Sequence, residues 1–431
     1  MQARLDGKLA LLYTLLVLQV LIVVIYVAST PPPELVASTT RNSVSFVKFE
    51  SPQAKQESEP LVNRKSLPSY RTINSQILLK DISTFKLFEK YNLTSCWREG
   101  VNDRRMKKED DLEKCVCNQG WHGSDCGQPE VVWRAIMASK QNIKLKKRKI
   151  ARRIIHVFSI NDYNSAIAEV IVEELYGVVD LFVIYDFSNA EDNFRHKLAK
   201  GLLRREQHKI LYVNLEGKIR KPSRVISTYI WDRMNSVVMN LRDDDIYVTT
   251  EPEQILNSRA LMFLKIYDGW PQPIGFRLRW SVFGFFWQHP MKTSITVGAC
   301  TISFTREVYR SNSLILPKEL GGEVTERDVL GLVIGDLNHY GGWYCYLCQD
   351  PANIITSLRH KTKSREIKFE KNIDVPFVED LIGTGVFLDG KTNLLRAYKS
   401  RDPYYAPETV LNNTWKYDWL VENFYAKLDY Y

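Results

Sequence analysis

Two glutamates, Glu251 and Glu253, directly follow the apolar run IYVTT at residues 246–250. Carboxylate oxygens suit Mg²⁺ and Mn²⁺, and a divalent cation can neutralise the charge of a diphosphate. Two carboxylates placed two positions apart at the end of a strand are therefore candidate metal ligands. An exposed acidic loop is the alternative interpretation, and the spacing alone leaves both open.

Four cysteines form a second pattern with chemical consequences. Cys115, Cys117 and Cys126 lie in CVCNQGWHGSDC, the C-x-C-x8-C ending of an EGF-type module, and Cys96 lies upstream. In an oxidising compartment this pattern predicts the disulfides Cys96–Cys115 and Cys117–Cys126. A zinc site that includes the nearby His122 is the alternative.

Cys345 and Cys348 have the C-x-x-C spacing of redox motifs. In a luminal protein we interpret them as a structural disulfide. Since the chain has seven cysteines, one is left unpaired.

A run of twenty residues without charge, residues 9–28, has the length of a bilayer span. At about 1.5 Å per residue, a helix of this length covers roughly the 30 Å of the hydrocarbon core. Arg4 and Lys8 precede the run and favour a cytosolic tail at residues 1–8, which makes the rest of the chain luminal. We predict a type II signal anchor; a cleaved signal peptide, whose apolar core is usually shorter, is the alternative.

Two acceptor triplets for N-linked glycans agree with a luminal location. They begin at Asn92 (Asn-Leu-Thr) and at Asn412 (Asn-Asn-Thr). Both asparagines are predicted glycosylation sites, although such triplets also occur by chance.

The net charge of +9 comes from 59 Lys and Arg against 50 Asp and Glu, and much of it lies in a basic run at residues 144–153. We interpret most of this run as part of a solvated connector at residues 129–152. A luminal location takes the run away from polynucleotides, so we expect no nucleic-acid partner.

The chain divides by composition into a stem, a module and a body. Residues 29–90, rich in Pro, Ser, Thr and charge, are predicted to form a flexible stem, and residues 91–128 the cystine module. In residues 153–431, apolar runs alternate with helical spacing, which predicts β-α-β units and an open α/β sheet whose carboxyl edge binds the ligand. After residue 270 the sequence is rich in aromatic and turn-forming residues, which predicts loops or antiparallel additions that form an acceptor cleft. The predicted strands lie at residues 154–160, 178–187, 210–215 and 245–250.

Several strings, in one order over about residues 95–425, together resemble glycosyltransferase family 17. They are KCVCNQGWHGSDCG, RRII, GVVDLFVI, FLKIYDGW, FGFFWQ, the H-x-x-G-W-x-C-x-x-C block from His339 to Cys348, and YAP at residues 405–407. The resemblance implies a Golgi type II membrane enzyme with a GT-A-like nucleotide-sugar fold, UDP-N-acetylglucosamine as donor and Mn²⁺ (or Mg²⁺) as cofactor. The implied reaction is inverting transfer of N-acetylglucosamine to the 4-hydroxyl of the core β-mannose of N-glycans.

The same resemblance suggests roles for individual residues, each with a structural alternative. Glu251 and Glu253 stand where relatives carry aspartates, and are the expected metal ligands. Asp268 and Glu174 compete for the role of general base, and Asp268 has turn-holding as its alternative. The expected donor- or substrate-binding residues, with strand capping or core packing as their alternatives, are Asp244, Asp245, Trp270, Trp287, His339 and Trp343.

The altered carboxylate cluster keeps a second interpretation open. Glutamate is one methylene longer than aspartate, and Pro252 stiffens the turn between the two glutamates. A catalytically weakened family member that binds glycans or partner proteins in the Golgi fits this change. A non-enzymatic surface protein would fit the anchor and the cystine module but leaves the large α/β body unexplained. The sequence indicates no oligomeric state.

Overall fold

The structure is a computed structural model, and the contacts within it divide the chain into residues 1–63 and residues 64–431. It describes residues 16–19, 21, 70–72, 74–108, 114–160, 164–186, 194–215, 223–310, 331–363 and 373–426. Of the predicted span at residues 9–28, only residues 16–19 and 21 are described, and they are helical. Within the described ranges, no helix is both long enough and apolar enough to cross a bilayer. The predicted anchor otherwise lies outside the described residues.

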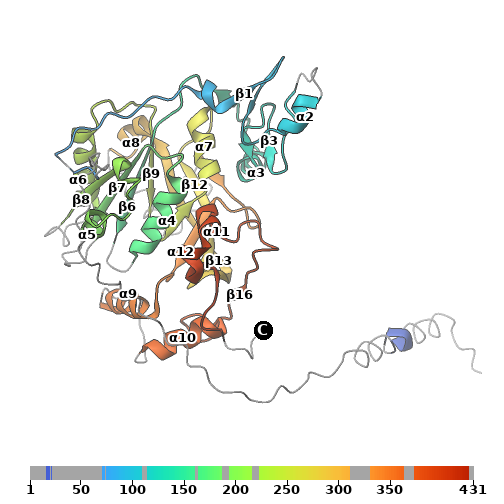
Figure 1. The fold of residues 1–431 in the computed structure, drawn as a ribbon, viewed down its shortest axis with the longest axis vertical. Coiled ribbons are helices and arrows are strands. Elements are labelled where there is room, and N and C mark those ends of the chain that lie inside the picture. Colours follow the sequence, from blue (N-terminus) through green and yellow to red (C-terminus); the bar gives the residue numbers. More distant parts are fainter. Residues whose placement is uncertain are drawn as a thin grey trace, which may run out of the picture. The chain divides into compact units, whose positions relative to one another are not determined.

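A large mixed sheet forms the centre of residues 64–431 (Figure 1). Its strand order is β10–β15–β12–β13–β9–β6–β7–β8, with β14 beside β12 and β16 beside β13. The strands are β6 (Ile154–Ile160), β7 (Leu181–Asp186), β8 (Ile210–Asn214), β9 (Ile246–Thr250), β10 (Gln254–Leu256), β12 (Ile274–Val282), β13 (Gly284–Thr301), β14 (Leu332–Ile334), β15 (Gly342–Tyr346) and β16 (Leu395–Arg396). The expected α/β class is confirmed as a mixed α/β fold.

The four strands predicted from apolar runs are confirmed, and they form the parallel part of the sheet. β6 lies between β9 and β7, and β8 follows β7, with Phe158 opposite Thr250 and Ile155 opposite Leu181. Parallel strands are buried on both faces, which explains why these runs are almost continuously apolar. Their carboxyl ends meet at one edge of the sheet, called the carboxyl edge below.

The other half of the sheet is mainly antiparallel, in agreement with the texture after residue 270. β13 pairs antiparallel with both β9 and β12, and β15 then pairs parallel with β12. Ile274, the first residue of β12, and Val248 of β9 both pair with Ala299. β12 therefore starts level with Val248, near the end of β9, and continues for eight more residues, which takes it past the carboxyl edge. β15 pairs with this later part of β12, so it also lies past the edge.

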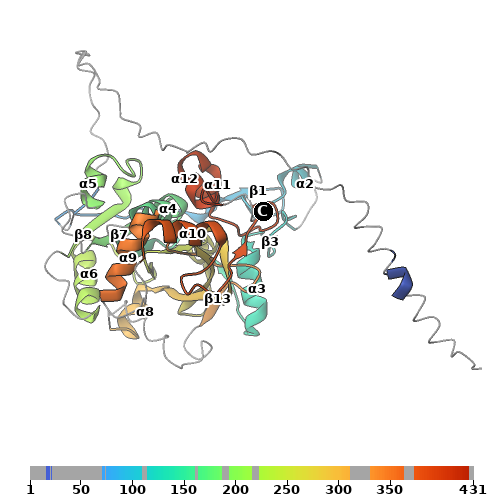
Figure 2. The ribbon, with the colours of Figure 1, turned by 90° about the horizontal axis from the view of Figure 1, so that it is seen from below.

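Helices cover both faces of the parallel strands (Figure 2). Ile154 and Phe158 of β6 point to one face and share a core with α4 (Ser165–Leu175) and α7 (Ser258–Ile266). Ile155 and Val157 point to the other face and share a core with α6 (Ser223–Val237). This alternation is the period of two that a strand imposes on its side chains. The other described helices are α2 (Asp103–Lys108), α3 (Glu130–Ser139), α5 (Phe194–Ala199), α8 (Ile302–Glu307), α9 (Pro351–Lys363), α10 (Val375–Thr384), α11 (Glu408–Asn412) and α12 (Thr414–Val421).

The predicted cystine module is present, and its disulfides are those predicted. Cys96 pairs with Cys115 and Cys117 with Cys126, so no thiolate remains there for the alternative zinc site. Short strands complete the module: β1 (Phe88–Lys90) with β2 (Ser95–Trp97), and β3 (Trp121–His122) with β4 (Gln128–Pro129). A module this small buries little apolar surface, so covalent links replace a core. The predicted disulfide between Cys345 and Cys348 is also confirmed.

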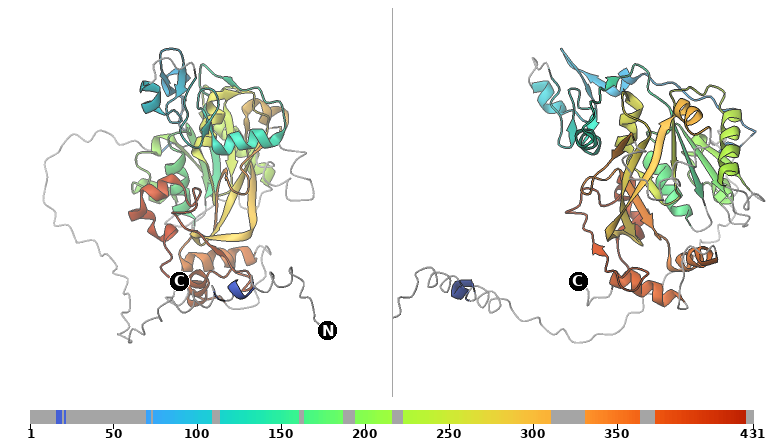
Figure 3. Two further views of the ribbon diagram at one scale, coloured as in Figure 1. Left: turned by 90° about the vertical axis from the view of Figure 1, so that its right-hand side faces the viewer. Right: turned by 180° about the vertical axis from the view of Figure 1, so that it is seen from behind.

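The module packs against the body beside α7 (Figure 3). The Tyr267 hydroxyl, just after α7, reaches both oxygens of the Asp125 carboxylate in the module, each at 2.8 Å. A Cβ atom at Gly127 would lie 1.9 Å from that hydroxyl, so only glycine leaves room for the contact. This charge-assisted hydrogen bond between Tyr267 and Asp125 therefore attaches the module to the body at a defined place.

The C-terminal end of the basic run is buried in the body, which corrects the interpretation of the run as a solvated connector. Residues 129–152 contain α3 and β5 (Lys146–Lys147), and β5 pairs with β11 (Tyr267–Asp268). Arg152 and Arg153 are 8% and 1% exposed. Burial of a guanidinium requires ionic partners, which the density of positive charge along the sequence does not reveal.

Residues 74–84, within the predicted flexible stem, pack on the body, which corrects the prediction for this part of the stem. Ile77 and Leu79 are buried in the core that contains α6, and Ile77 forms a bridge with Val238. Before them, the Arg71 amide donates to the Ile210 oxygen, and the Tyr212 amide donates to the Arg71 oxygen. Arg71 therefore lies beside β8, the last strand of the sheet.

Cys300 is the one cysteine outside the disulfides, and it is buried in β13. Burial raises the pKa of its thiol to about 11. Since the thiolate is the nucleophile, we expect no alkylation of the native chain by iodoacetamide at neutral pH and one adduct after unfolding without reductant. Intact-mass measurement before and after unfolding tests this, and rapid labelling of the native chain would contradict it.

Candidate functional site

Hydrogen-bonded polar side chains stabilise the carboxyl edge. The Tyr212 hydroxyl donates to Asp186 Oδ2 at the end of β7 (2.9 Å). His156 Nε2 lies 2.8 Å from Thr250 Oγ1 at the end of β9. Burial lowers the pKa of His156 to about 3, so its imidazole is neutral at physiological pH. The contact between His156 and Thr250 fixes the end of β9, which Glu251 directly follows.

Glu251 and Glu253 lie at this edge but in different surroundings. Glu251 is exposed, whereas 8% of Glu253 is exposed. The Tyr344 hydroxyl donates a hydrogen bond to Glu253, whose backbone oxygen also accepts from the Cys345 amide (2.9 Å). Burial, and then the negative charges of Glu253 and Glu251, raise the pKa of Tyr344 well above its ordinary value. The phenol therefore stays protonated and remains a donor to Glu253.

Tyr344 belongs to a group of aromatic side chains on the part of the sheet that extends past the edge. We call Trp280, Tyr344, Tyr346 and His289 the edge cluster. The Trp280 ring lies 4.6 Å from that of Tyr344 and 6.3 Å from that of His289, and Tyr346 lies 6.0 Å from Tyr344. The ammonium of Lys292 lies 5.4 Å from the Trp280 ring. Aromatic faces of this kind can pack against a sugar ring or a base.

The surroundings of the two glutamates do not fit a paired cation site. The Glu251 side chain is at the surface, and Glu253 is buried beneath a hydroxyl that donates to it. In the part of the chain that the structure describes, no three His, Cys, Asp or Glu side chains gather as metal ligands. Metal binding by this pair stays a prediction, and no step below depends on it.

Asp244 and Asp245 lie at the opposite edge of the sheet, because they precede β9. Asp245 is fully buried and accepts from Arg153 Nη2 at 2.5 Å and from Nε at 2.9 Å. Asp244 forms ion pairs with Arg148 and, at 3.3 Å, with Arg242. The length of β9, at about 3.3 Å per residue, separates the two edges by roughly 17 Å. The structure therefore does not bring these aspartates to the carboxyl edge, and their contacts favour strand capping.

Asp268 and Trp270 also lie among structural contacts. Asp268 Oδ1 accepts from Arg148 Nη1 (2.6 Å) and Arg152 Nη2 (2.5 Å). The Trp270 indole donates to the Tyr267 oxygen (2.8 Å), and the Arg152 guanidinium lies 5.0 Å from its ring. Two arginines occupy the carboxylate, so these contacts favour a turn-holding role for Asp268 over that of proton acceptor.

Trp287 and His339 have different surroundings. The Trp287 indole is 9% exposed and donates to the Ile382 oxygen (2.8 Å), which makes it a core side chain. His339 Nδ1 lies 3.1 Å from Asp336 Oδ1, and the His339 ring packs edge-on against Tyr404 at 5.8 Å. His339 therefore supports Tyr404, which lines the pocket described next.

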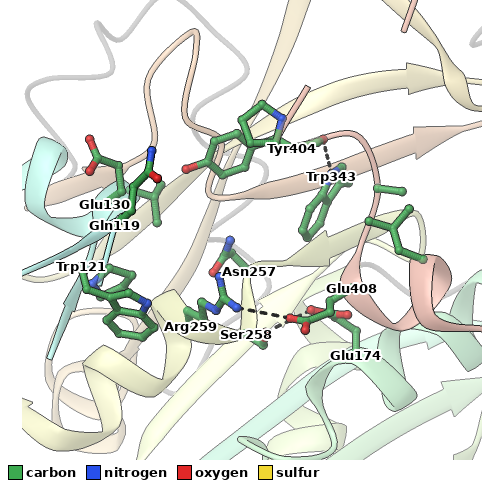
Figure 4. Close-up of a pocket in the computed structure, with 16 residues that line it drawn as sticks. Gln119, Trp121, Glu130, Glu174, Asn257, Ser258, Arg259, Trp343, Tyr404 and Glu408 are labelled. Atoms are coloured by element: carbon green, nitrogen blue, oxygen red, sulfur yellow. Dashed lines mark hydrogen bonds and ion pairs between the residues drawn. The ribbon is translucent and has the colours of Figure 1, made fainter. Parts of the chain in front are cut away.

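A pocket of about 330 Å³, which we call the module pocket, lies between the cystine module and the body (Figure 4). The module contributes Gln119 and Trp121, and the body contributes Glu174 at the end of α4, Trp343 of β15 and Tyr404. Glu174 and Trp343 are thus the two predicted site residues that the fold brings together here. β10 connects this pocket to the carboxyl edge, since it starts after Glu253 and ends before Asn257, another lining residue.

Glu174 is held in the module pocket by two donors. Its Oε1 accepts from the Ser258 hydroxyl (3.0 Å) at the start of α7, and its Oε2 accepts from the Thr409 amide (2.9 Å). Burial is the main cause that raises the pKa of Glu174; the two donors oppose it, and the nearby Glu408 charge adds to it. A carboxylate oriented by donors, with a raised pKa and facing a pocket, has the properties of a general base.

Arg259 links the walls of the module pocket. Its guanidinium pairs with Glu408 (3.5 Å) of α11 and with Glu99 (3.6 Å) of the module. The same group lies 5.8 Å from the Trp121 ring. These contacts are partly exposed, so each is weak, but together they tie three segments of the chain around one cavity.

The comparisons with known proteins identify relatives of the whole chain rather than of the site. No family model matches the chain. The chain is 30% identical over 360 residues to the β-1,4-mannosyl-glycoprotein 4-β-N-acetylglucosaminyltransferases of Mus musculus and Rattus norvegicus, matching 77% of this chain and 65% of each relative. The Homo sapiens protein of the same name is 29% identical over 368 residues, or 78% of this chain and 67% of the relative.

Identity of 30% over 77% of the chain is the level of homologous proteins, which makes this chain a relative of glycosyltransferases. More particularly, it is homologous to the β-1,4-mannosyl-glycoprotein 4-β-N-acetylglucosaminyltransferases, and the resemblance seen in its sequence is confirmed. The chain spans just under two thirds, 65%, of the length of the mouse and rat relatives.

Proposed function

We propose that this chain is a Golgi glycosyltransferase that moves N-acetylglucosamine from UDP-N-acetylglucosamine to the 4-hydroxyl of the core β-mannose of N-glycans, with inversion. The homology over 360 residues to enzymes named for this transfer carries the proposal. A GT-A-like arrangement of the parallel strands, with the donor at their carboxyl edge, is part of it. Ligands of open α/β sheets bind at that edge.

The proposed reaction forms one bond and breaks one bond. The 4-hydroxyl oxygen of mannose attacks the anomeric carbon of N-acetylglucosamine, and the bond from that carbon to the β-phosphate oxygen breaks. UDP leaves with the electron pair of the broken bond. The hydroxyl proton passes to a protein carboxylate, and attack from the opposite side inverts the anomeric centre.

Glu174 is the carboxylate that we propose for this proton transfer. It faces the module pocket, its two donors orient it, and burial raises its pKa toward the range in which a base works best. Trp343 and Tyr404 in the same pocket supply aromatic surface for the acceptor sugar. The rival candidate, Asp268, is occupied by Arg148 and Arg152.

The nucleotide part of the donor, we propose, lies against the edge cluster. Because Tyr344 and Trp343 are neighbours on β15 and point to opposite faces of the sheet, the donor must pass around β10, the outermost strand, for its anomeric carbon to meet Glu174. Trp280 and Tyr344 offer ring faces next to the strand ends, and Lys292 is a cation beside them. A nucleotide sugar presents a base, a sugar and a diphosphate, which suit ring faces and a cation respectively. Manganese as a cofactor for the diphosphate remains a prediction from the resemblance.

A second candidate function is a glycan-binding family member with weakened catalysis. The buried position of Glu253 under the Tyr344 hydroxyl favours it, because a carboxylate engaged in this way is not available to a cation without rearrangement. In this case the module pocket would still bind glycans of Golgi glycoproteins.

The proposed location is the Golgi membrane, with a single type II anchor at residues 9–28 and the body in the lumen. Asn92 and Asn412, the predicted glycosylation sites, are both exposed, as acceptor asparagines must be. The disulfides of the module support an oxidising compartment.

The test is transfer by the full chain, purified in detergent, from UDP-N-acetylglucosamine to a biantennary N-glycan in the presence of Mn²⁺. We expect the glycan to gain one N-acetylhexosamine by mass spectrometry, 4-linked to the core β-mannose by linkage analysis. A reaction without donor is the control, and a parallel reaction with EDTA tests the manganese prediction.

Two other outcomes are informative. If the glycan stays unchanged while UDP raises the Tm of the chain, the second candidate is favoured. If the glycan stays unchanged and UDP leaves the Tm where it was, the proposed transferase function is rejected.

A further inference from the structure

We propose that the cystine module forms one wall of the acceptor site, and that this wall binds an uncharged sugar unit of the glycan acceptor. The inference rests on the proposed function, because it assigns a substrate subsite to the module pocket. It also gives the module a role that its disulfides and its homology do not indicate.

The position of the pocket carries the first step. Gln119 and Trp121 come from the module, whereas Glu174 and Tyr404 come from segments far away in the sequence, and all four line one cavity (Figure 4). Its volume of about 330 Å³ lies within the range of roughly 300–1,000 Å³ that small-molecule sites occupy. Without the module, one side of this cavity would be open solvent.

The chemistry of the lining selects the ligand class. Trp121, Trp343 and Tyr404 offer apolar ring surface, while Gln119 and Asn257 carry amides that donate and accept. A sugar ring has the complementary pattern, because its C–H face is apolar and its rim carries hydroxyls. Aromatic and amide groups together therefore fit a carbohydrate better than a purely apolar ligand.

The charges of the lining argue against the diphosphate donor. Three carboxylates, those of Glu130, Glu174 and Glu408, face the pocket, and Arg259 is the cation that lines it among the described residues. Glu130 is already paired with Arg134 at 2.6 Å and with His122, and Glu408 with Arg259 at 3.5 Å. Among the described lining residues, the three carboxylates outnumber the one guanidinium, so the lining as a whole repels phosphate. The Glu174 carboxylate can also accept hydrogen bonds from sugar hydroxyls.

The wall is held in place before any ligand arrives. The Tyr267 hydroxyl bonds to Asp125 of the module, and Arg259 pairs with Glu99 of the module. A wall fixed by such contacts loses little freedom when a ligand binds, which favours affinity. The module therefore acts as a rigid part of the site.

The experiment fills the pocket from its module side. Gln119 is exposed and stands at a turn, so Gln119→Trp should fold and place a bulky ring in the cavity. Arg104→Trp is the matched control, because Arg104 is exposed on α2 of the same module and does not line the pocket. With the full chain in detergent, the Kd of a biantennary N-glycan is measured by saturation-transfer NMR without donor, and the Kd of UDP by calorimetry.

We expect Gln119→Trp to weaken glycan binding at least about tenfold, as loss of a central contact does, with UDP binding unchanged. Arg104→Trp should bind both ligands like the original chain. Equal glycan affinity in all three chains, no glycan binding by the original chain, or equal weakening by both substitutions would overturn the inference. Loss of UDP binding in Gln119→Trp would overturn it as well, since the pocket would then hold the donor.

The same measurements separate this inference from the proposed function. Glycan binding that Gln119→Trp abolishes, in a chain that transfers no sugar, supports the module wall and rejects the transferase. Transfer that proceeds with an unchanged KM for the glycan in Gln119→Trp supports the transferase and rejects the module wall.

Discussion

Replacing Asp245 with alanine is expected to lower the free energy of unfolding by about 3–5 kcal/mol, the cost of breaking a buried ion pair by removing one partner. The Asp245 carboxylate is fully buried and accepts from two nitrogens of Arg153 and from the Arg242 amide (2.8 Å). Arg153, 1% exposed, would be left as a buried guanidinium with its main partner gone. The measurement is unfolding by urea, followed by tryptophan fluorescence.

The control for this prediction is Asp243→Ala, two positions away. Asp243 pairs with Arg306 at the surface, with 74% of its side chain exposed, so its removal should change stability little. In Asp245→Ala molecules that remain folded, the Kd of UDP should equal that of the original chain. The reason is that Asp245 lies at the edge of the sheet opposite the carboxyl edge. A selective loss of UDP affinity at unchanged stability would instead restore Asp245 as a donor-binding residue.

Replacing Glu174 with glutamine is expected to lower kcat for transfer about a hundredfold or more, the usual contribution of a general base. The carboxylate must be ionised to accept the proton, and burial raises its pKa. The rate of the original chain should therefore fall as the pH drops through this raised pKa. The glutamine variant should lack this acidic limb, and pH–rate profiles of both chains test the prediction.

Stability separates a lost base from a damaged fold. A carboxyl group whose folded pKa is raised stabilises the fold at low pH, and that contribution is lost as the pH rises from its unfolded pKa through its folded pKa. At neutral pH the ionised Glu174 is thus a cost, and glutamine should leave the Tm equal or higher. A large fall in Tm would mean that the lost rate reflects unfolding.

Asp268→Asn is the competing variant. Because Asp268 pairs with Arg148 and Arg152, its change should lower the Tm while the acidic limb of the pH–rate profile persists. If Asp268→Asn removes that limb and Glu174→Gln does not, the roles of the two carboxylates are reversed.

The parallel strands could be predicted from the sequence because burial on both faces demands continuous apolar residues. Residues 154–160 and 246–250 are runs of this kind, and both are strands. The disulfides could be predicted for another reason, since the spacing of Cys115, Cys117 and Cys126 follows a known module. In both cases the signal is local in the sequence, as an unbroken apolar run or as cysteines at a fixed spacing.

The positions of the charged residues depended on partners that the sequence does not show. Arg153 lies in a basic run, and its burial follows from Asp245, 92 positions further along the chain. Asp244 and Asp245 matched a family pattern, yet a residue before a parallel strand lies at the amino edge. The direction of the strand was therefore a better guide to their place than the match.

The module pocket had no sequence signal. Its walls come from Trp121, Glu174, Trp343 and Tyr404, which meet only after the module has docked on α7. Glu174 and Trp343 were candidates by resemblance, but Gln119, Glu130, Tyr404 and Glu408 were missed. Gln119 lies in the cysteine string CVCNQGWHGSDC, but nothing in that string marks it as a binding residue, and the other three lie in no pattern of charge or periodicity.

The contact of Arg71 with β8 limits where the chain can be cut to make a secreted version. β8 is the last strand of the sheet. On its outer side, the Arg71 amide donates to the Ile210 oxygen, and the Arg71 oxygen accepts from the Tyr212 amide. Cutting at residue 90, where composition alone would end the stem, would remove Arg71, Ile77 and Leu79 together. The bare edge would then offer unpaired amides to other copies, and such edges promote aggregation. A secreted version should therefore begin before Tyr70.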